Sequence, residues 1–343
     1  MTIVDLVRPD LLGPVLTQAT GDDRWRSLSA SLIAGGKSNL TFEITSEAGA
    51  VILRRPPLGD LVSSAHDMER EVRIQQALVG TSVPVPKIVL FEASGDLLGV
   101  PFYVMEKLPG YIIGSEMPAG YAQLPEEKLA LADALVDVLV DLHTIDPVAI
   151  ELGDYGRPHG YLERQIRRWN DQWSRSKTHE VKAVDELGRR LAARQPRSQK
   201  ESIVHGDYRL DNCLMALDDP SRINGVLDWE LSTLGDPLSD LGLLLFYWRE
   251  PDEYVPVLIP SVTRSPGFPR KAHLAERYGQ RTGARIDDIP FYEAFAHFKF
   301  AVIAQGILAR VEAGAMAGQS FGNLDEEVRN VAEEGITILK LRS

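Results

Sequence analysis

Two short apolar runs, each followed closely by acidic residues, constrain this chain more than any other feature. Residues 202–204 read Ser-Ile-Val and lead into a segment that holds Asp207 and Asn212, while residues 223–227 lead directly into Asp228. Brief apolar runs of this kind favour buried strands. Because the residues after a strand emerge at the edge of its sheet, we expect loops there to aim two carboxylates and one carboxamide at a common ligand.

The order and spacing of these three side chains are typical of kinases. Kinases carry a catalytic Asp, an Asn beyond a gap of four residues and a later Asp that binds magnesium. Asp207, Asn212 and Asp228 occur in that order and with that gap. Magnesium prefers oxygen ligands and usually takes one or two carboxylates from protein. Asn212 and Asp228 are therefore the predicted metal ligands, and Asp207 remains to orient an alcohol.

A plainer interpretation is a turn at residues 205–207 and a helix cap at Asp228. It leaves the ordered spacing and the preceding strands unexplained.

With these motifs the chain resembles the aminoglycoside phosphotransferase family of kinase-like enzymes, and most closely the branch whose members occur alone or fused to acyl-CoA dehydrogenases. The resemblance runs from about Leu32 to Gly242 with ordered motifs. It implies an α+β, bilobal protein-kinase-like fold, in which a small β-rich N-lobe (1–107) binds nucleotide. The larger, mainly helical C-lobe (108–343) would carry the catalytic loop and the acceptor site. The implied cofactors are ATP and Mg²⁺.

The same resemblance assigns roles to residues near the motif. It implies that Asp207 is the catalytic base and that Asn212 and Asp228 hold magnesium, with His205 bracing the loop. Asp236 and Asp240, in the sequence Gly-Asp-Pro-Leu-Ser-Asp, match a family motif that caps a helix and supports the site. An Asp before a Pro at the start of an apolar helix is also an ordinary helix-start signal, so we expect these two to be structural.

A glycine-rich segment upstream is the predicted phosphate loop. Glycines allow backbone N–H groups to approach phosphates closely, and we expect Gly35, Gly36, Ser38 and Asn39 to cover the ATP phosphates. The Gly-Lys-Ser triplet suggests a Walker A loop, but Ser31 occupies the place of the required earlier Gly. A hairpin also follows where that loop needs a helix. An ordinary hairpin turn is the alternative for this segment alone.

The strand after this loop carries the predicted phosphate-binding cation. Kinases place a Lys there; here Arg54 stands in that position, as is common in the branch resembled. Its partner is expected on the helix over 64–79, with Glu71 preferred to Glu69; a solvated ion pair is the alternative. Because neighbouring strand residues point to opposite faces, Arg55 should face away from the nucleotide.

The last strand of the small lobe, at 101–106, should run into a hinge near 107–110. The adenine edge is expected to meet backbone groups near Glu106 and Leu108. Met105 is expected to be a core or pocket residue.

Composition limits the class of protein. A chain of 343 residues suits two lobes, and its 44% hydrophobic and 25% charged residues are ordinary for a globular protein. A net charge of −12 argues against nucleic acid as a partner. We expect no membrane span and no signal peptide, and the single Cys213 fits a reducing cytoplasm and a place in the core. The sequence does not indicate an oligomeric state.

The predicted secondary structure differs between the two lobes, with strands mainly in the first and helices mainly in the second. Strands are predicted at 27–33, 40–45, 51–54, 87–92 and 102–106, and helices at 4–20, 65–78, 125–143, 161–177, 179–194, 237–248, 269–283, 287–313 and 324–341.

The acceptor is expected to be a small molecule with a hydroxyl group. The resemblance implies aminoglycosides, choline, amino-sugars or, in the branch resembled, hydroxyacyl-CoA thioesters, of which a hydroxyacyl or related metabolite is preferred. An aminoglycoside or amino-alcohol kinase is one alternative, and a nucleotide-binding pseudokinase, suggested by Arg54, is another. Arg164, Arg167 and Arg168, near Trp169, could form an anion site, although a solvated amphipathic helix explains them more simply.

Overall fold

The computed structural model describes residues 3–33, 39–57, 67–314 and 321–340. Two compact units make up the chain: the first contains Met1–Gly110 and Asn224–Ser232, and the second contains Tyr111–Ile223 and Thr233–Ser343. The sequence placed the boundary between residues 107 and 108 and assigned everything beyond it to the second lobe. The structure instead groups Asn224–Ser232 with the first unit, because that segment bonds to residues there, as described below.

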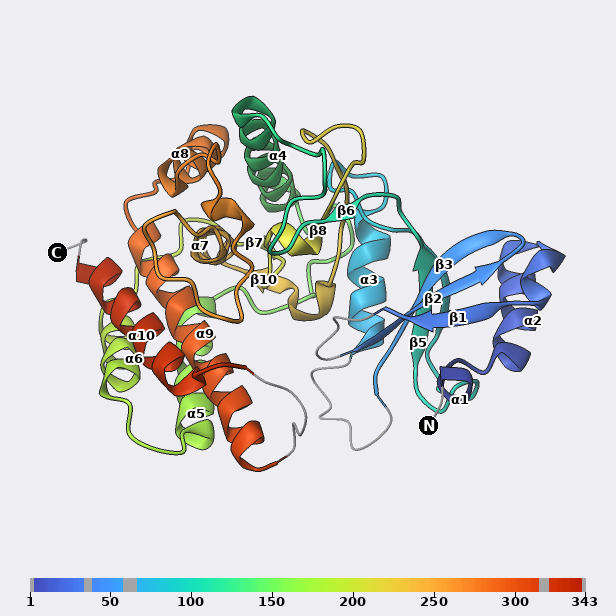
Figure 1. Ribbon diagram of the computed structural model, residues 1–343, viewed down its shortest axis with the longest axis horizontal. Helices are drawn as coiled ribbons and strands as arrows, with labels where there is room; N and C mark the ends of the chain where they lie inside the picture. The colour runs from blue at the N-terminus through green and yellow to red at the C-terminus, as the bar shows by residue number, and fades with distance from the viewer. Residues whose placement is uncertain (1–2, 34–38, 58–66, 315–320, 341–343) are drawn as a thin grey trace. The chain divides into compact units, whose positions relative to one another are not determined.

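The first unit is built on an antiparallel sheet in the order β1-β2-β3-β5-β4 (Figure 1). The strands lie close to their predicted positions, as β1 (Ser29–Leu32), β2 (Leu40–Ser46), β3 (Gly49–Arg55), β4 (Ile88–Glu92) and β5 (Phe102–Glu106). The strand β3 is central, since it pairs with β2 on one side and with β5 on the other. Residues of β3 are therefore fixed in register from both sides.

Helices cover both faces of this sheet. Val51 and Leu53 of β3 pack with residues of α1 (Ile3–Val7) and α2 (Pro9–Thr20). Ile52 points the other way, into a cluster with Met68 and Val72 of α3 (Met68–Leu78). This alternation is the period of a strand, and it places Arg54 on the α3 face and Arg55 on the α2 face.

The N-terminal helix is interrupted, which the sequence analysis did not anticipate. One helix was expected over 4–20, but α1 ends at Val7 and α2 begins at Pro9. Arg8 between them has a left-handed φ of 47°. Proline disfavours helical geometry in the residue before it and is well suited to the first helical position, so the chain restarts its helix at Pro9.

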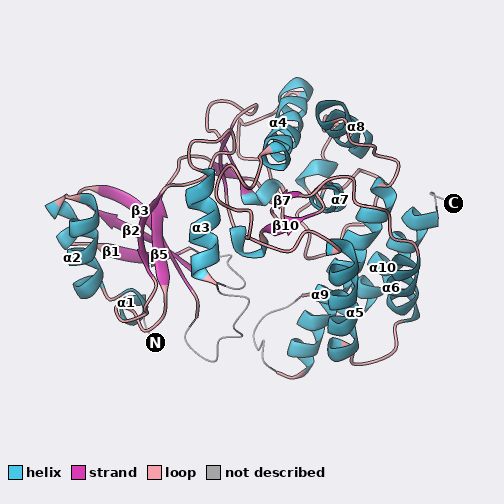
Figure 2. Cartoon of the chain, turned by 180° about the vertical axis from the view of Figure 1, so that it is seen from behind, coloured by secondary structure: helices cyan, strands magenta, loops and turns pink. Residues whose placement is uncertain are grey.

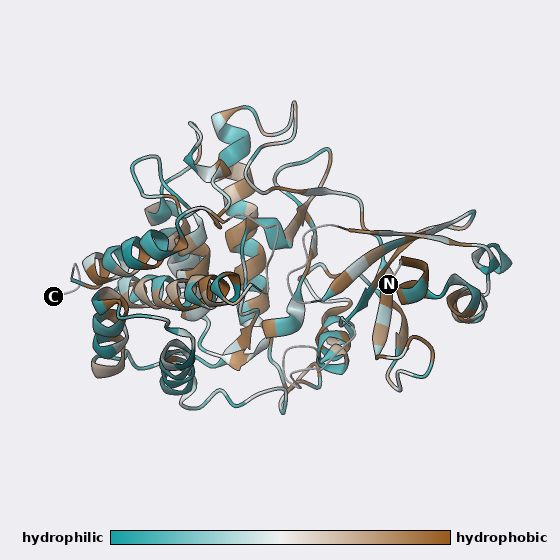
Figure 3. Cartoon of the chain, turned by 60° about the horizontal axis from the view of Figure 1, so that its bottom comes forward, coloured by the Kyte–Doolittle hydropathy of each residue, from teal (hydrophilic) through white to brown (hydrophobic). Residues whose placement is uncertain are grey.

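The second unit is mainly helical, as Figure 2 shows by colour. Its helices are α4 (Pro125–Thr144), α5 (Tyr161–Ser176), α6 (Lys182–Ala193), α7 (Leu238–Tyr247), α8 (Lys271–Thr282), α9 (Ile289–Glu312) and α10 (Leu324–Lys340). All seven lie near predicted positions. In Figure 3 apolar and polar residues alternate along the helices, as expected where one side of each helix packs on others.

The helix α9 is the centre of this unit. It packs against α5, α6, α7 and α10. By length and composition it is the one described helix that could cross a membrane, but 61% of its apolar window is buried inside the protein. That burial is the behaviour of a core helix.

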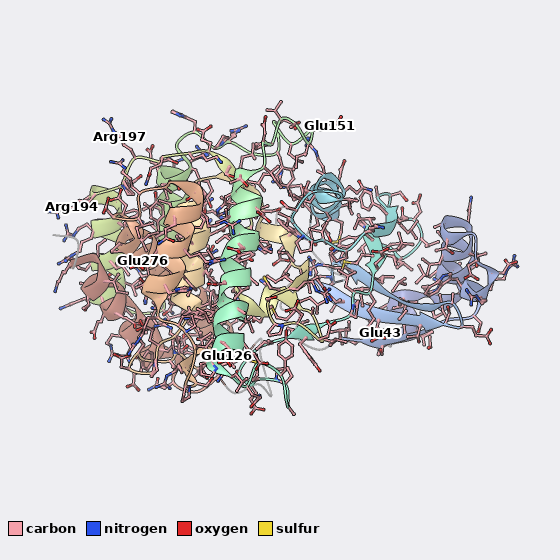
Figure 4. The ribbon with its side chains drawn as sticks, turned by 90° about the horizontal axis from the view of Figure 1, so that it is seen from above. Glu43, Glu126, Glu151, Arg194, Arg197 and Glu276 are labelled. Atoms are coloured by element: carbon pink, nitrogen blue, oxygen red, sulfur yellow. The ribbon has the colours of Figure 1, made fainter. Side chains whose placement is uncertain are left out.

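Charged side chains join α4 to α8, which lie against each other. In Figure 4 the labelled residues Glu126 and Glu276 mark the helices α4 and α8, respectively. The guanidinium of Arg277 on α8 lies 2.8 Å from the carboxylate of Asp137 and 3.1 Å from that of Asp133, both on α4.

Short strands surround the predicted catalytic segment. The strand β7 (Ser202–Val204) pairs with β10 (Thr233–Gly235), and β6 (Tyr111–Ile112) pairs with β8 (Cys213–Met215). The strands β6 and β10 were not predicted. The strand β9 (Ile223–Val226) passes from the second unit into the first. Cys213 is fully buried, which confirms its predicted place in the core.

Candidate active site

The turn after β7 is held by one buried carboxylate. The backbone N–H groups of His205 and Gly206 donate to Asp240, at 2.6 Å and 2.8 Å. Gly206 has a positive φ of 82°, which a side chain would resist. The Asp240 carboxylate thereby fixes the backbone that presents Asp207.

Asp240 is itself held by a histidine from α4. The Nε2 atom of His143 lies 3.2 Å from the Asp240 carboxylate, and its Nδ1 atom lies 2.8 Å from the hydroxyl of Tyr278. Burial alone would raise the pKa of Asp240, but His143 and the backbone N–H of His205 outweigh it and hold that pKa below its usual value. The supporting role predicted for Asp240 thus has a concrete form, whereas no sequence signal identified His143.

Asp207 and Asn212 are brought together as their spacing predicts. The Asn212 amide nitrogen donates to the backbone carbonyl of Asp207 at 2.8 Å and to its carboxylate at 3.1 Å. The Nε atom of Arg209 donates to the same carboxylate oxygen at 3.2 Å. The Asp207 side chain is 23% exposed, so solvent or a substrate can reach it.

Two cations near Asp207 were not identified from the sequence. Arg209 bridges Asp207 and Asp211, whose carboxylate lies 2.7 Å from its Nη1 atom, and it stacks over the ring of Tyr247. Lys299 of α9 donates to the Gly206 carbonyl at 2.7 Å. Lys299 lies more than ninety residues from this turn in the chain, so only the fold reveals the contact.

In the first unit Arg54 is the centre of an acidic cluster. Its Nε atom lies 3.0 Å from the Glu71 carboxylate, and its Nη2 atom pairs with Asp228 and, at 3.2 Å, with Glu230. Glu71, rather than Glu69, is thus the ion-pair partner on α3, as expected. The Arg54 side chain is 12% exposed and the Glu71 side chain 1%, so this is not a solvated surface pair.

Further hydrogen bonds fix Glu71 within this cluster. The hydroxyl of Tyr103 donates to its carboxylate at 2.8 Å, and the amide of Asn39 donates to it at 3.0 Å and to Glu230 at 3.2 Å. Burial raises the pKa of Glu71 to about 7, although Arg54 and Tyr103 oppose that shift. Asn39, predicted in the phosphate loop, therefore contacts the residues around Arg54.

The segment that carries Asp228 is bonded into the first unit on both of its flanks. The Asn224 amide donates to the Pro109 carbonyl at 2.8 Å, and the Val226 N–H donates to the Pro84 carbonyl at 2.8 Å. Arg70 donates to the Ser232 carbonyl at 3.2 Å. Asp228 has a left-handed φ of 66°. A non-glycine residue in this region is uncommon and often marks a functional position.

The predicted adenine contacts lie at the end of β5 and just after it. The N–H of Glu106 already donates to the Lys87 carbonyl at 2.9 Å, so that donor is not available to a base. The Leu108 side chain lies close to Gly225: a Cβ atom added to Gly225 would lie 2.8 Å from it. Gly35, Gly36 and Ser38, the remaining predicted nucleotide contacts, fall outside the described residues.

Arg55 lies on the opposite face from Arg54, as strand alternation requires. It is fully buried, and its guanidinium donates to the backbone carbonyls of Leu6, Leu98 and Pro56. These contacts make Arg55 a structural residue of the α2 face.

The oxygen donors suit magnesium. Because the Asn212 amide nitrogen is occupied by Asp207, its oxygen is the atom left for a cation. Asp228 supplies a carboxylate that is 31% exposed. Each of these two oxygen groups, considered separately within its own unit, is of the kind that Mg²⁺ prefers.

Comparison with known proteins finds a family model that matches most of the chain. A model described as the phosphotransferase enzyme family matches residues 29–295. A solved structure of a Ralstonia eutropha protein described as an aminoglycoside phosphotransferase is 34% identical, with a TM-score of 0.82 over 97% of this chain and 98% of that one.

Other relatives are more distant or longer. Acyl-CoA dehydrogenase family member 11 of Rattus norvegicus is 34% identical over 328 residues, which are 93% of this chain but 41% of the relative. The chain thus spans about two fifths of that relative. An aminoglycoside phosphotransferase solved with GDP and kanamycin has a TM-score of 0.63 over 97% of this chain and 98% of that one at 17% identity, which shows the fold alone.

Proposed function

This chain belongs to the phosphotransferase enzyme family, and from that premise we propose that it transfers the γ-phosphoryl group of ATP to a small-molecule hydroxyl in the presence of Mg²⁺. The observation that carries the proposal is the geometry of Asp207. Its carboxylate is held by Asn212 and Arg209 at the end of a turn that Asp240 fixes, yet it remains partly exposed. A rigid, reachable carboxylate is what an acceptor hydroxyl needs.

In the proposed reaction Asp207 accepts a hydrogen bond from the acceptor hydroxyl and takes its proton as the oxygen attacks. The new bond joins that oxygen to the γ-phosphorus, and the bond from phosphorus to the β,γ-bridging oxygen breaks. ADP leaves with the electron pair of that bond. Mg²⁺, when bound by Asn212 and Asp228, would neutralise phosphate charge. Little covalent work is required of the protein, so positioning supplies most of the catalysis.

Arg54 is the proposed contact for the α- and β-phosphates. In the structure its guanidinium pairs with the carboxyl groups of Glu71, Asp228 and Glu230. Nucleotide phosphates carry the same charge as these carboxylates and can take the place of the more exposed ones. Glu71, whose side chain is 1% exposed, would continue to hold the Nε side of the guanidinium. Arginine suits this task because its planar fork matches two phosphate oxygens.

For the acceptor we favour a hydroxyacyl-CoA or a related metabolite. Relatives named after acyl-CoA dehydrogenases cover almost the whole of this chain at about one-third identity, which supports an acyl-type acceptor. The aminoglycoside phosphotransferase bound to kanamycin matches at 17% identity, which supports the fold but not that substrate. An aminoglycoside, an amino alcohol and a nucleotide-binding pseudokinase are the alternatives.

The test is acceptor-dependent ADP formation by the purified chain with ATP and Mg²⁺. The acceptors are hydroxyacyl-CoA thioesters of several chain lengths, free hydroxy acids, choline and kanamycin, and mass spectrometry identifies the phosphorylated product. Asp207→Asn should lower turnover by about 10²–10⁴-fold. Asp218→Asn is the matched control, since its side chain is 79% exposed. Equal turnover in the Asp207 and Asp218 variants would disprove the assignment; nucleotide binding without transfer to any acceptor would support a pseudokinase.

A further inference from the structure

Lys299 has hydrogen-bonding capacity that the turn does not use. Its ammonium group has three donors. In the part of the chain that the structure describes, the one acceptor it contacts is the Gly206 carbonyl, at 2.7 Å. This carbonyl belongs to the residue immediately before Asp207. Two donors on a partly exposed side chain therefore remain beside the proposed catalytic base.

Other cations surround Lys299. Its Nζ atom lies 5.8 Å from the ring centroid of Trp169, on α5, and the adjacent Arg168 is near enough for its charge to act on Lys299. Arg168 is exposed and makes no ion pair among the residues the structure describes. Arg209 donates to the Asp207 carboxylate, and its charge also acts on Lys299.

The carboxylates near this point already have partners before any ligand binds. Arg209 pairs with Asp207 and Asp211, and the Asp240 carboxylate accepts from two backbone N–H groups. Among the described residues, no carboxylate forms an ion pair with Lys299 or Arg168. Burial lowers the pKa of Lys299, and Asp207 and Asp240 only partly oppose that shift. A partly buried ammonium beside other cations is stabilised when an anion joins it.

We propose that Lys299 and Arg168 form an anion subsite that binds a carboxylate or phosphate group of the acceptor next to Asp207. The proposal rests on the function proposed above and narrows it, because it makes the acceptor an anion. Amino alcohols and aminoglycosides carry positive charge, and the same two side chains would repel them. The flat face of Trp169 adds an apolar wall for the carbon chain between the acceptor's hydroxyl and its anionic group.

A purely structural role for Lys299 is the competing explanation, since it could serve only to brace the Gly206 carbonyl. Arg168 separates the two explanations, because among the described residues it makes no hydrogen bond or ion pair with the turn. Arg168→Gln is therefore the principal variant, and Lys299→Gln is the second. Arg175→Gln is the matched control: it removes an exposed arginine two helical turns further along α5.

The experiment compares probes that differ mainly in charge: 3-hydroxybutyrate, its neutral amide, 3-hydroxybutyryl-CoA and choline. The wild-type chain should have a lower KM for the anions than for the amide. Arg168→Gln and Lys299→Gln should raise the KM for the anions about 10- to 100-fold, the loss expected for one charge-assisted hydrogen bond. The KM for the amide and for ATP should change little, and Arg175→Gln should match wild type. An effect confined to the free acid identifies a carboxylate as the ligand group, and one confined to the thioester identifies the CoA phosphates.

Binding without nucleotide separates failure of this proposal from failure of the proposed function. Trp169 fluorescence, with Trp169→Phe as the blank, reports binding of each probe even if none is phosphorylated. Binding of the anions that is lost in Arg168→Gln supports the subsite whatever the catalytic result. Transfer to any probe with equal KM in wild type and Arg168→Gln overturns the subsite and leaves the kinase assignment intact. A fall in kcat alone for Lys299→Gln, with Arg168→Gln unaffected, establishes the bracing role instead. If the chain neither binds nor phosphorylates any of the anions, the subsite is overturned as well.

Discussion

Replacing Asp240 by Asn should reveal how much the catalytic turn depends on one charge. The Asp240 carboxylate receives the N–H of His205 on one oxygen and the N–H of Gly206 on the other, and His143 shares the first oxygen. An Asn side chain has one acceptor oxygen and one NH₂ group. Whichever way the amide is turned, at least one backbone N–H group meets another donor.

The free energy of unfolding should fall by about 2–3 kcal/mol in Asp240→Asn, the upper range for a lost hydrogen bond to a charged group. About 1–3 kcal/mol of this comes from one buried N–H group left unsatisfied. Asp236 provides the matched comparison, because it is as buried as Asp240. Its carboxylate accepts from the Tyr292 hydroxyl and from the Leu238 N–H. A hydroxyl can rotate and accept from an amide, so Asp236→Asn should cost only about 1 kcal/mol.

Urea unfolding and amide hydrogen exchange measure the two effects. Urea unfolding gives the loss in global unfolding free energy for each variant. Exchange of the His205 and Gly206 amides reports the loss of local stability in the turn. Those two amides should exchange faster in Asp240→Asn than in Asp236→Asn, and phosphoryl transfer should fall in parallel. Equal losses in the two variants, or a loss below about 1 kcal/mol for Asp240→Asn, would refute the argument from donor count.

The two carboxyl groups should also respond oppositely to pH. The pKa of Asp240 lies below its usual value, so its stabilising contribution is present above the unfolded value of about 3.9 and is lost as pH falls through the folded value. Burial raises the pKa of Asp236, so its contribution decreases as pH rises above about 3.9. Asp240→Asn should therefore flatten the acid limb of the stability profile, and Asp236→Asn should not.

Three further outcomes follow from the first unit and the core. Arg54→Ala should weaken ATP binding by about one to two decades, with Arg54→Lys milder, whereas Arg55→Met should lower stability; nucleotide titration and urea unfolding separate the two. If only the Arg55 variant loses ATP affinity, the assignment of the two faces is wrong. Asp228→Asn should weaken the dependence of ATP binding on Mg²⁺, measured by titration with and without chelator, and an unchanged dependence would exclude it as a ligand. Gly242→Ala should destabilise the second unit by about 1–3 kcal/mol, because its Cβ would lie 2.5 Å from Tyr292; a thermal midpoint equal to wild type would contradict this.

Local pattern was enough to predict most elements and the core of the site. Arg54 and Arg55 were placed on opposite faces by alternation alone, and Glu71 was preferred as the Arg54 partner before any contact was known. Asp207 and Asn212 meet because both lie in one short segment after a strand. In each case the relevant neighbours are close in sequence or are set by a regular period.

The remaining contacts depend on the fold and left no local signal. His143 and Lys299 reach the catalytic turn from helices far away in the chain. Glu230 was overlooked although it follows Asp228 by two residues, because its partner Arg54 lies on a strand far away in the chain. The break at Arg8 was missed for a different reason: the Pro9 signal was present, but the apolar period continues across it.

The grouping of Asn224–Ser232 with the first unit has a consequence for how this protein can be divided. The backbone passes from one unit to the other at 110/111, at 223/224 and at 232/233, so no single cleavage separates them. A fragment ending at Gly110 would keep Arg54 and Glu71 but lose Asp228 and Glu230, leaving the guanidinium short of two of its three anionic partners. The ion-pair cluster around Arg54 can therefore be completed only after residue 230 has been synthesised.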